Sequence, residues 1–333
     1  MTSGAANPMS EAIILTASDL RPLRDNPEAM GGALDAIENA LITRYQGGVR
    51  EQRIVDRRPG EFEGIRVALM AGDDLLSGMR IFGNPPHTRA FMLFDGETRA
   101  MLALMDYGVL NSMRVGAIAG VATKYLAPKD AHTVGLLGSG WQAPMQLHAL
   151  TRAVPAIDHV KVYSRTPANR EKFAAEMTAR LRIPVVAVDS VKAALDGVDI
   201  VDICAPGHFD VREPLFEPEW VRPGALAVSM ASNQYSAAFI TQCRVCAASF
   251  ESLTEGNTAV QPYGELMQQG RFTKDDVTEL GAVITKGIDP RRTPEDTVIY
   301  HLEGGSAQDL FLATWGYEWA KANGLGKPFD LSA

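Results

Sequence analysis

Cysteine is scarce in this chain of 333 residues, which contains only Cys204, Cys243 and Cys246. So small a number indicates a reducing compartment. The last two form one Cys-x-x-Cys pair, and a single pair without a second set of ligands is weak evidence for zinc. We therefore interpret them as small residues on or beside a buried strand and predict no metal site.

Long apolar runs and clusters of positive charge are also missing. No stretch approaches the ~20 apolar residues that span a bilayer, and the N-terminal sequence MTSGAANPMSEA lacks the basic and apolar regions of a signal peptide. The formal charge is −8, from 40 acidic and 32 basic residues spread along the chain. Without a basic stripe, neither nucleic acid nor an acidic membrane is expected as a partner, and we predict a soluble, cytoplasmic protein.

The composition is that of a globular protein, with 46% hydrophobic and 22% charged residues, and the length favours two domains. Ser18, in the position of an N-cap, and Pro27 precede a predicted helix near 27–46. Short β-like runs separated by turn signals then predict a small, mostly antiparallel sheet over about 52–105. An Ala/Gly-rich segment at 112–126 is expected to be helical.

Strand and helix signals alternate in the second half of the chain. Strands are predicted at 133–137, 159–163, 184–188, 199–204 and 225–230, with helices at 141–153, 167–181 and 190–196. This alternation is typical of a doubly wound parallel sheet with right-handed crossovers. A last helix, roughly 306–322, carries Leu310, Phe311, Trp315 and Trp319 at helical spacing, which predicts packing at a domain or subunit interface.

A glycine-rich turn lies between the first of these strands and its helix. It reads Gly138-Ser139-Gly140-Trp141-Gln142-Ala143. Such a turn after an apolar strand and before a helix is typical of a dinucleotide site, where the second glycine lets backbone N–H groups reach the pyrophosphate. A glycine turn without a ligand is the alternative.

The end of the second strand distinguishes the two nicotinamide cofactors. NAD is bound through a carboxylate that accepts the ribose hydroxyls, whereas an arginine can receive the 2′-phosphate of NADP. Here the sequence reads Ser164-Arg165-Thr166, without a carboxylate. We therefore expect NADP in preference to NAD, the alternative being a solvated turn.

Two segments, MRVGAIAGVATKYLAPKDAHTVGLLGSGWQA at 113–143 and GGSAQDLFLATWGYEWAKANGLG at 304–326, resemble the ornithine cyclodeaminase/mu-crystallin family. The resemblance extends over roughly residues 15–325. It implies an α/β fold in which a Rossmann-type, doubly wound parallel sheet at 116–305 is inserted in a discontinuous α+β domain. That second domain, 1–115 with 306–333, would bind a substrate carrying an α-carboxylate and form a homodimer.

The resemblance also assigns residues to the site. It implies that Arg53 holds the substrate carboxylate, although a surface charge is the alternative, and that Arg114 approaches the cofactor phosphates. The cofactor site would also include Ala205 and Met230. The family's catalytic lysine falls on Arg80, its partner glutamate on Ala68, and the aspartate that serves ornithine cyclisation on Asn233.

These replacements change the expected chemistry. A guanidinium stays charged and cannot exchange protons, and asparagine cannot take up a proton from an amine, so cyclodeamination is disfavoured. Imine reduction requires mainly that the substrate is oriented against the nicotinamide, and Arg53 with Arg80 could hold one carboxylate or two. His87 is the nearest proton donor in the sequence, with Asp106 and Tyr107 behind it, although a loop histidine is more often solvated.

Three functions follow in order of preference. The first is an NAD(P)-dependent oxidoreductase that transfers hydride between the nicotinamide and the α-carbon of a small amino acid or its imine, as an imine reductase in preference to an amino-acid dehydrogenase. The second is ornithine cyclodeaminase, with Arg80 and other groups replacing the missing ones. The third is a cofactor-binding protein with little turnover.

Overall fold

The computed structural model describes residues 12–56, 65–72, 77–82, 89–205, 214–230, 234–254, 262–302 and 305–330. The chain divides into two compact units. Unit 1 combines Met1–Arg114 with Ser306–Ala333, and unit 2 is the continuous segment Val115–Gly305.

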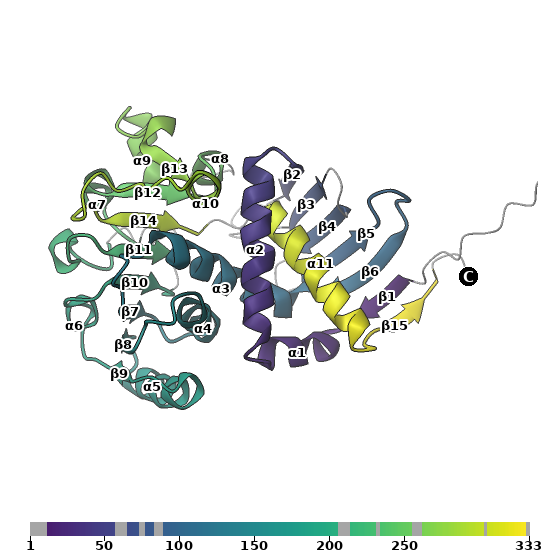
Figure 1. The fold of residues 1–333 in the computed structure, drawn as a ribbon, viewed down its shortest axis with the longest axis horizontal. Helices are drawn as coiled ribbons and strands as arrows, with labels where there is room; N and C mark the ends of the chain where they lie inside the picture. The colour runs from purple at the N-terminus through teal and green to yellow at the C-terminus, as the bar shows by residue number, and fades with distance from the viewer. Residues whose placement is uncertain are drawn as a thin grey trace, which may run out of the picture. The chain divides into compact units, whose positions relative to one another are not determined.

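Unit 1 is built on a seven-stranded sheet with the order β15-β1-β6-β5-β4-β3-β2 (Figure 1). Its strands are β1 (Ala12–Leu15), β2 (Val49–Asp56), β3 (Ile65–Gly72), β4 (Ser77–Phe82), β5 (Arg89–Phe94), β6 (Met101–Asp106) and β15 (Lys327–Phe329). Neighbours from β2 to β6 are antiparallel, as predicted for this region. The first and last strands pair with each other, which the sequence did not indicate.

Helices α1 (Ala17–Asp25) and α11 (Ser306–Ala322) lie against the strands of this sheet, and α2 (Ala29–Tyr45) packs against α11. Figure 1 shows α11 crossing the strands, with α2 beside it. The last helix is confirmed, and Leu310 is buried, while the indole of Trp315 lies against Gly32 of α2.

Two helix starts differ from the prediction. Residues 17–25 form a helix, and Thr16 rather than Ser18 caps it, because Thr16 and Asp19 exchange hydrogen bonds in a capping box. Helix α3 (Tyr107–Leu126) begins at 107 instead of 112. The carboxylate of Asp106 accepts the N–H of Gly108 at 2.9 Å and therefore stabilises this earlier first turn.

Unit 2 contains an eight-stranded, fully parallel sheet with the order β13-β12-β14-β11-β10-β7-β8-β9. Its strands are β7 (Thr133–Leu137), β8 (His159–Tyr163), β9 (Val185–Ala187), β10 (Ile200–Ile203), β11 (Leu226–Ser229), β12 (Arg244–Ala247), β13 (Val277–Glu279) and β14 (Val298–His301). This arrangement confirms the predicted Rossmann-type fold.

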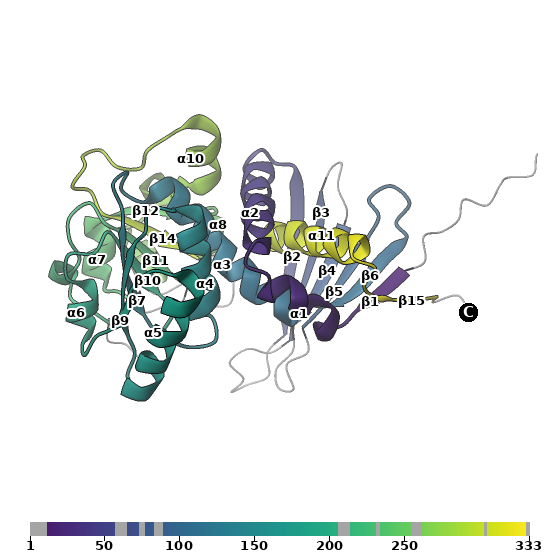
Figure 2. The same cartoon turned by 60° about the horizontal axis from the view of Figure 1, so that its bottom comes forward.

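Helices lie on both faces of the parallel sheet. They are α4 (Ala143–Ala153), α5 (Pro167–Leu181), α6 (Val191–Leu195), α7 (Ala237–Gln242), α8 (Glu251–Thr254), α9 (Tyr263–Gln268) and α10 (Leu280–Lys286). Figure 2 shows α4 and α5 on one side and α6 and α7 on the other. No helix in the described part of the chain is long and apolar enough to cross a membrane.

Candidate active site

The glycine turn of unit 2 has the backbone geometry of a dinucleotide site. Gly138 follows β7 with φ of 112°, and a Cβ atom there would come within 2.8 Å of the backbone nitrogen of Ala205. Only glycine fits such a position. At Gly140 a Cβ would meet no atom within 4 Å, so open space lies beside this residue. The first glycine is required by close packing, and the second leaves room for an anion at the start of α4.

The remaining residues of the turn lie around this space. Ser139 donates a hydrogen bond from its hydroxyl to that of Ser164 at 2.8 Å, which joins the turn to the end of β8. Trp141 is 63% exposed, an unusual environment for so large an apolar side chain, whereas Gln142 and Ala143 are buried. The turn therefore presents its backbone and one indole ring outward.

The segment after β8 carries the predicted 2′-phosphate site. Arg165 and Thr166 are exposed and Ser164 is half-buried. Arg170, a residue that the sequence did not single out, is buried behind them and donates to the carbonyl of Ser164 at 3.0 Å and to Asp189 at 2.6 Å. In the sequence, only its position in the first turns of the helix predicted at 167–181 could have pointed to Arg170. Arg170 fixes the backbone from which Arg165 extends.

Two further predicted cofactor residues lie at the carboxyl ends of adjacent strands. Ala205 comes just after β10, and Met230 directly follows β11. The buried amide of Gln234 donates to the carbonyl of Ala205 at 2.6 Å and bonds to the hydroxyl of Ser229. Since β8, β7, β10 and β11 are consecutive in the sheet, the residues of unit 2 predicted to bind the cofactor lie along the carboxyl edge of the sheet.

A buried polar cluster lies beneath the turn. Gln146 of α4 donates to the carboxylate of Asp202 on β10 at 3.0 Å, and the thiol of Cys204 donates to the amide oxygen of Gln146 at 2.8 Å. Burial raises the pKa of Asp202 to about 7. The cluster ties the helix that begins at the glycine turn to the neighbouring strand, although Asp202 lies in an apolar run that predicts only a core strand.

In unit 1 the positions assigned to the substrate form one cross-strand row. The register pairs Arg53 with Ala68, Ala68 with Arg80, and Arg80 with Phe91. Directly opposed residues share one face of a sheet, and here Ala68, Arg80 and Phe91 are buried. Only the backbone of Arg53 is described; it lies two strands from Arg80, which corresponds to roughly 10 Å.

A buried carboxylate is the counter-ion of Arg80. Asp309, in the first turn of α11, is fully buried and forms an ion pair with Arg80. Tyr107 donates its hydroxyl to the same carboxylate at 2.9 Å, and Nε of Arg114 lies 3.4 Å from it. The guanidinium of Arg114 also donates to Asn111 at 2.7 Å. Asp309 thus holds together three polar side chains from two elements, Arg80 of β4 and Tyr107 and Arg114 of α3.

This cluster fixes the charge state of Tyr107. Burial, followed by the charge of Asp309, raises the pKa of Tyr107 well above its usual value, so this phenol keeps its proton. Asp106, the other group expected behind His87, caps α3 through its carboxylate. His87 and Asn233 lie outside the described residues.

The surroundings of Cys243 and Cys246 indicate that this pair has a structural role. Cys246 is buried on β12, and Cys243 lies just before this strand. Burial raises the pKa of Cys243 to about 12, and it also raises that of Cys246, so both remain thiols. Within the described ranges, no group of His, Cys, Asp and Glu side chains is placed to hold a metal ion.

Comparisons with known proteins point to one family. The family model described as "Ornithine cyclodeaminase/mu-crystallin family" matches residues 77–324. A putative dehydrogenase of Rhizobium meliloti is 29% identical, and the match covers 97% of this chain and 100% of that protein. The ketimine reductase mu-crystallin of Rattus norvegicus is 27% identical, with 77% of this chain and 80% of the relative covered.

A solved structure agrees with these sequence matches. The Δ1-pyrroline-2-carboxylate reductase of Thermococcus litoralis, in complex with NADH and L-proline, superposes with a TM-score of 0.83. It is 26% identical, and the match covers 95% of this chain and 100% of that one.

Proposed function

Because the chain belongs to the ornithine cyclodeaminase/mu-crystallin family, we propose that it is an NAD(P)-dependent oxidoreductase that reduces a small imine carrying an α-carboxylate. Relatives named as ketimine reductase and Δ1-pyrroline-2-carboxylate reductase support this class of substrate. The observation that carries the choice of reduction over cyclodeamination is the buried ion pair between Arg80 and Asp309.

Arg80 occupies the position at which the family resemblance places a lysine. A guanidinium has a pKa above ~12 and cannot act as acid or base near neutral pH, and the guanidinium of Arg80 forms an ion pair with Asp309. Cyclodeamination requires proton transfer at two steps, whereas a protonated imine is already electrophilic. Arg80 is suited to hold and orient a carboxylate, with Arg53 in the same row and His87 assigned as proton donor.

The glycine turn fits a dinucleotide. Gly138, Gly140 and the start of α4 would hold the pyrophosphate, and the bound nicotinamide supplies the hydride. We propose NADP in preference to NAD, because the exposed Arg165 stands between two hydroxyl side chains and residues 163–166 include no Asp or Glu. Arg170 supports this segment from behind through its bond to Ser164.

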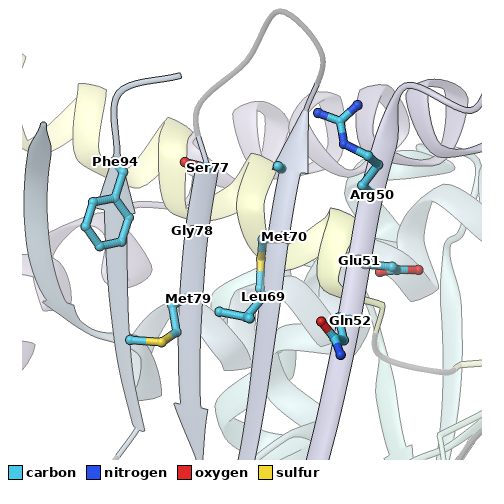
Figure 3. Close-up of a pocket in the computed structure, with 10 residues that line it drawn as sticks. Arg50, Glu51, Gln52, Leu69, Met70, Ser77, Gly78, Met79 and Phe94 are labelled. Atoms are coloured by element: carbon cyan, nitrogen blue, oxygen red, sulfur yellow. The ribbon is translucent and has the colours of Figure 1, made fainter. Parts of the chain in front are cut away.

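We further propose that the working unit is a homodimer formed through the sheet face opposite α11. Ile54 and Leu69 on this sheet are 53% and 41% exposed. Figure 3 shows Leu69, Met79 and Phe94 projecting from the strands on the side away from the helix, where they line a groove of about 580 Å³. A second copy would remove this apolar surface from water. Leu69→Lys is expected to give monomers in size-exclusion chromatography with light scattering.

Activity assays test the main proposal directly. We expect NADPH absorbance to fall on addition of Δ1-pyrroline-2-carboxylate or a related cyclic ketimine, and less rapidly with NADH. Ornithine should give neither proline nor ammonia in the presence of catalytic NAD. Proline formation from ornithine would identify a cyclodeaminase, and tight NADPH binding without turnover of any imine would identify a binding protein.

A further inference from the structure

A cavity of about 570 Å³ lies in unit 2 at the amino ends of its strands. Three loops build it: the one before β7, the one before β11 and the one before β14. The charged side chains among its lining residues are Lys129, Asp130, Arg222, Asp289, Arg291 and Arg292. Because the glycine turn lies at the carboxyl ends of the same parallel strands, this cavity is on the opposite edge of the sheet.

The charge of the lining is opposite in sign to that of the chain. Four of these side chains are cationic and two are acidic, a surplus of two positive charges in a protein of formal charge −8. Positive charges gathered around one cavity make its electrostatic potential positive and attract an anion.

Arg291 is the most deeply placed of these cations. Its side chain is only 11% exposed, and burial lowers its pKa. Its nearest carboxylate, that of Asp289, lies 3.8 Å away and is itself 63% exposed, so the pairing is long and solvated. The guanidinium also donates to the carbonyl of Gly224 at 3.3 Å, but no described residue accepts a hydrogen bond from its Nε. A buried cation is normally paired more closely.

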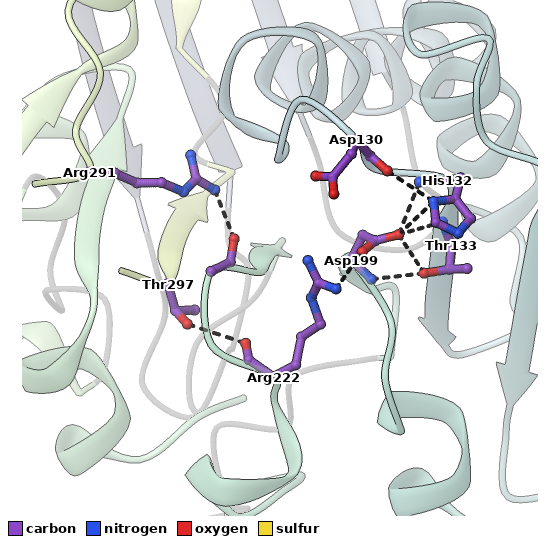
Figure 4. Close-up of polar contacts among 8 residues, drawn as sticks. Asp130, His132, Thr133, Asp199, Arg222, Arg291 and Thr297 are labelled. Atoms are coloured by element: carbon purple, nitrogen blue, oxygen red, sulfur yellow. Dashed lines mark hydrogen bonds and ion pairs between the residues drawn. The ribbon is translucent and has the colours of Figure 1, made fainter. Parts of the chain in front are cut away.

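Arg222 is held in place by a carboxylate that serves several other donors. Its guanidinium lies 3.0 Å from Asp199, as Figure 4 shows. The same carboxylate accepts the backbone N–H of His132 and of Thr133, each at 2.9 Å, and the Thr133 hydroxyl at 2.6 Å. The Asp199 carboxylate is therefore shared among four donor groups and does not engage all five N–H groups of Arg222. The remaining N–H groups can donate to a ligand.

The loops around the cavity are fixed by backbone contacts. Gly224 has φ of 78°, and a Cβ there would lie 2.5 Å from the carbonyl oxygen of Pro294. Its N–H donates to the carbonyl of Glu295 at 2.8 Å, and the N–H of Arg292 donates to Asp296 at 2.8 Å. The cations are therefore positioned before any ligand arrives, which lowers the entropic cost of binding.

From these observations we propose that the cavity is a binding site for a phosphate dianion, either inorganic phosphate or a small phosphate monoester. Guanidinium groups bind phosphate oxygens through paired, charge-assisted hydrogen bonds. A phosphate group carries about −1.5 to −2 charge near pH 7, opposite in sign to the net charge of the lining residues. The site is independent of the dinucleotide turn, and nothing in this proposal rests on the proposed reductase activity.

Isothermal titration calorimetry of the full chain with inorganic phosphate, at ionic strength matched with chloride, tests the site. Arg291→Gln and, separately, the exposed Arg292→Gln are each expected to weaken phosphate binding about tenfold, the loss of one charge-assisted contact. Arg180→Gln removes an equal charge from the exposed surface of α5 and should leave the affinity unchanged. Since Arg292 is exposed, its variant keeps the test valid if Arg291→Gln unfolds.

A further variant, in the glycine turn, separates this cavity from the cofactor site. Gly140→Asp places a carboxylate in the open space of the glycine turn and should leave phosphate binding intact. The proposal is overturned if phosphate binds no better than chloride, or if Gly140→Asp abolishes binding while the arginine variants retain it. Repeating the titration with glycerol 3-phosphate shows whether the monoester or free phosphate is preferred.

Discussion

Replacing Asp309 by asparagine removes the negative charge of the unit 1 cluster while keeping its shape. The carboxylate is fully buried and contacts Arg80, Tyr107 and Arg114. Asparagine can still accept the hydrogen bond from Tyr107 through its amide oxygen, so packing and this bond are preserved. What changes is that two largely buried guanidinium groups lose their shared counter-ion.

The cost can be worked from the contacts. Neutralising one member of a buried ion pair lowers stability by about 3–5 kcal/mol, because an uncompensated charge stays in the interior. Arg114 has a second acceptor in Asn111, which places the expected loss near the lower limit, about 3 kcal/mol. For a domain of this size that corresponds to a melting temperature lower by roughly 6–12 °C.

Differential scanning fluorimetry with three companion variants, Tyr107→Phe, Arg80→Met and the double variant Asp309→Asn with Arg80→Met, isolates the charge effect. Tyr107→Phe removes one hydrogen bond to the same carboxylate and is expected to cost less, about 1.5 kcal/mol. Combining Asp309→Asn with Arg80→Met removes the stranded cation, so the double variant should recover about 2 kcal/mol relative to additivity. An Asp309→Asn protein that melts within about 2 °C of the wild type would refute the reasoning, because no buried counter-ion is that dispensable.

Three other predictions test unit 2. Gly138→Ala should lower both stability and cofactor affinity, whereas Gly140→Ala should leave the melting temperature unchanged and weaken only cofactor binding, as read by Trp141 fluorescence on titration with NADPH. Arg165→Ser should raise KM for NADPH about tenfold and leave KM for NADH within about twofold, and equal effects on both would contradict the assignment. Burial raises the pKa of Asp202 from 3.8 to about 7, so between these pH values the folded chain binds a proton that the unfolded chain has lost, and stability falls as pH rises. Asp202→Asn should flatten this slope in thermal unfolding, melting above the wild type beyond pH 7 and close to it below about pH 4.

Most of the regular elements of the fold were predictable where local patterns are strong. The strand at 133–137 and the helices at 167–181 and 306–322 match the prediction residue for residue. By contrast, apart from a buried strand at or beside Cys243 and Cys246, no element was predicted between residues 231 and 305, where the described residues form three strands and four helices. β13 spans three residues and α7 and α9 span six each, too few for a hydrophobic period to emerge.

The candidate site likewise has one part that the sequence predicts and one part that it does not. The glycine turn is readable because all its residues are consecutive and its conformation requires glycine. Asp309 and Arg80 are 229 positions apart, and their contact depends on how α11 lies across the sheet, which no local pattern encodes. Their pairing also depends on strand register, since a shift of one residue would turn Arg80 to the other face.

Unit 1 is assembled from both ends of the chain, and its completion therefore depends on the order of synthesis. Unit 2 is continuous and can form its sheet while later residues are still being translated. The sheet face with Phe91, however, is covered by α11, which is made about 200 residues after β6, or on the order of 10–40 s later at ordinary elongation rates. During that interval an apolar sheet face and the Arg80 guanidinium lack their partners. The nascent chain is therefore most prone to aggregation, and most in need of a chaperone, just before its last helix leaves the ribosome.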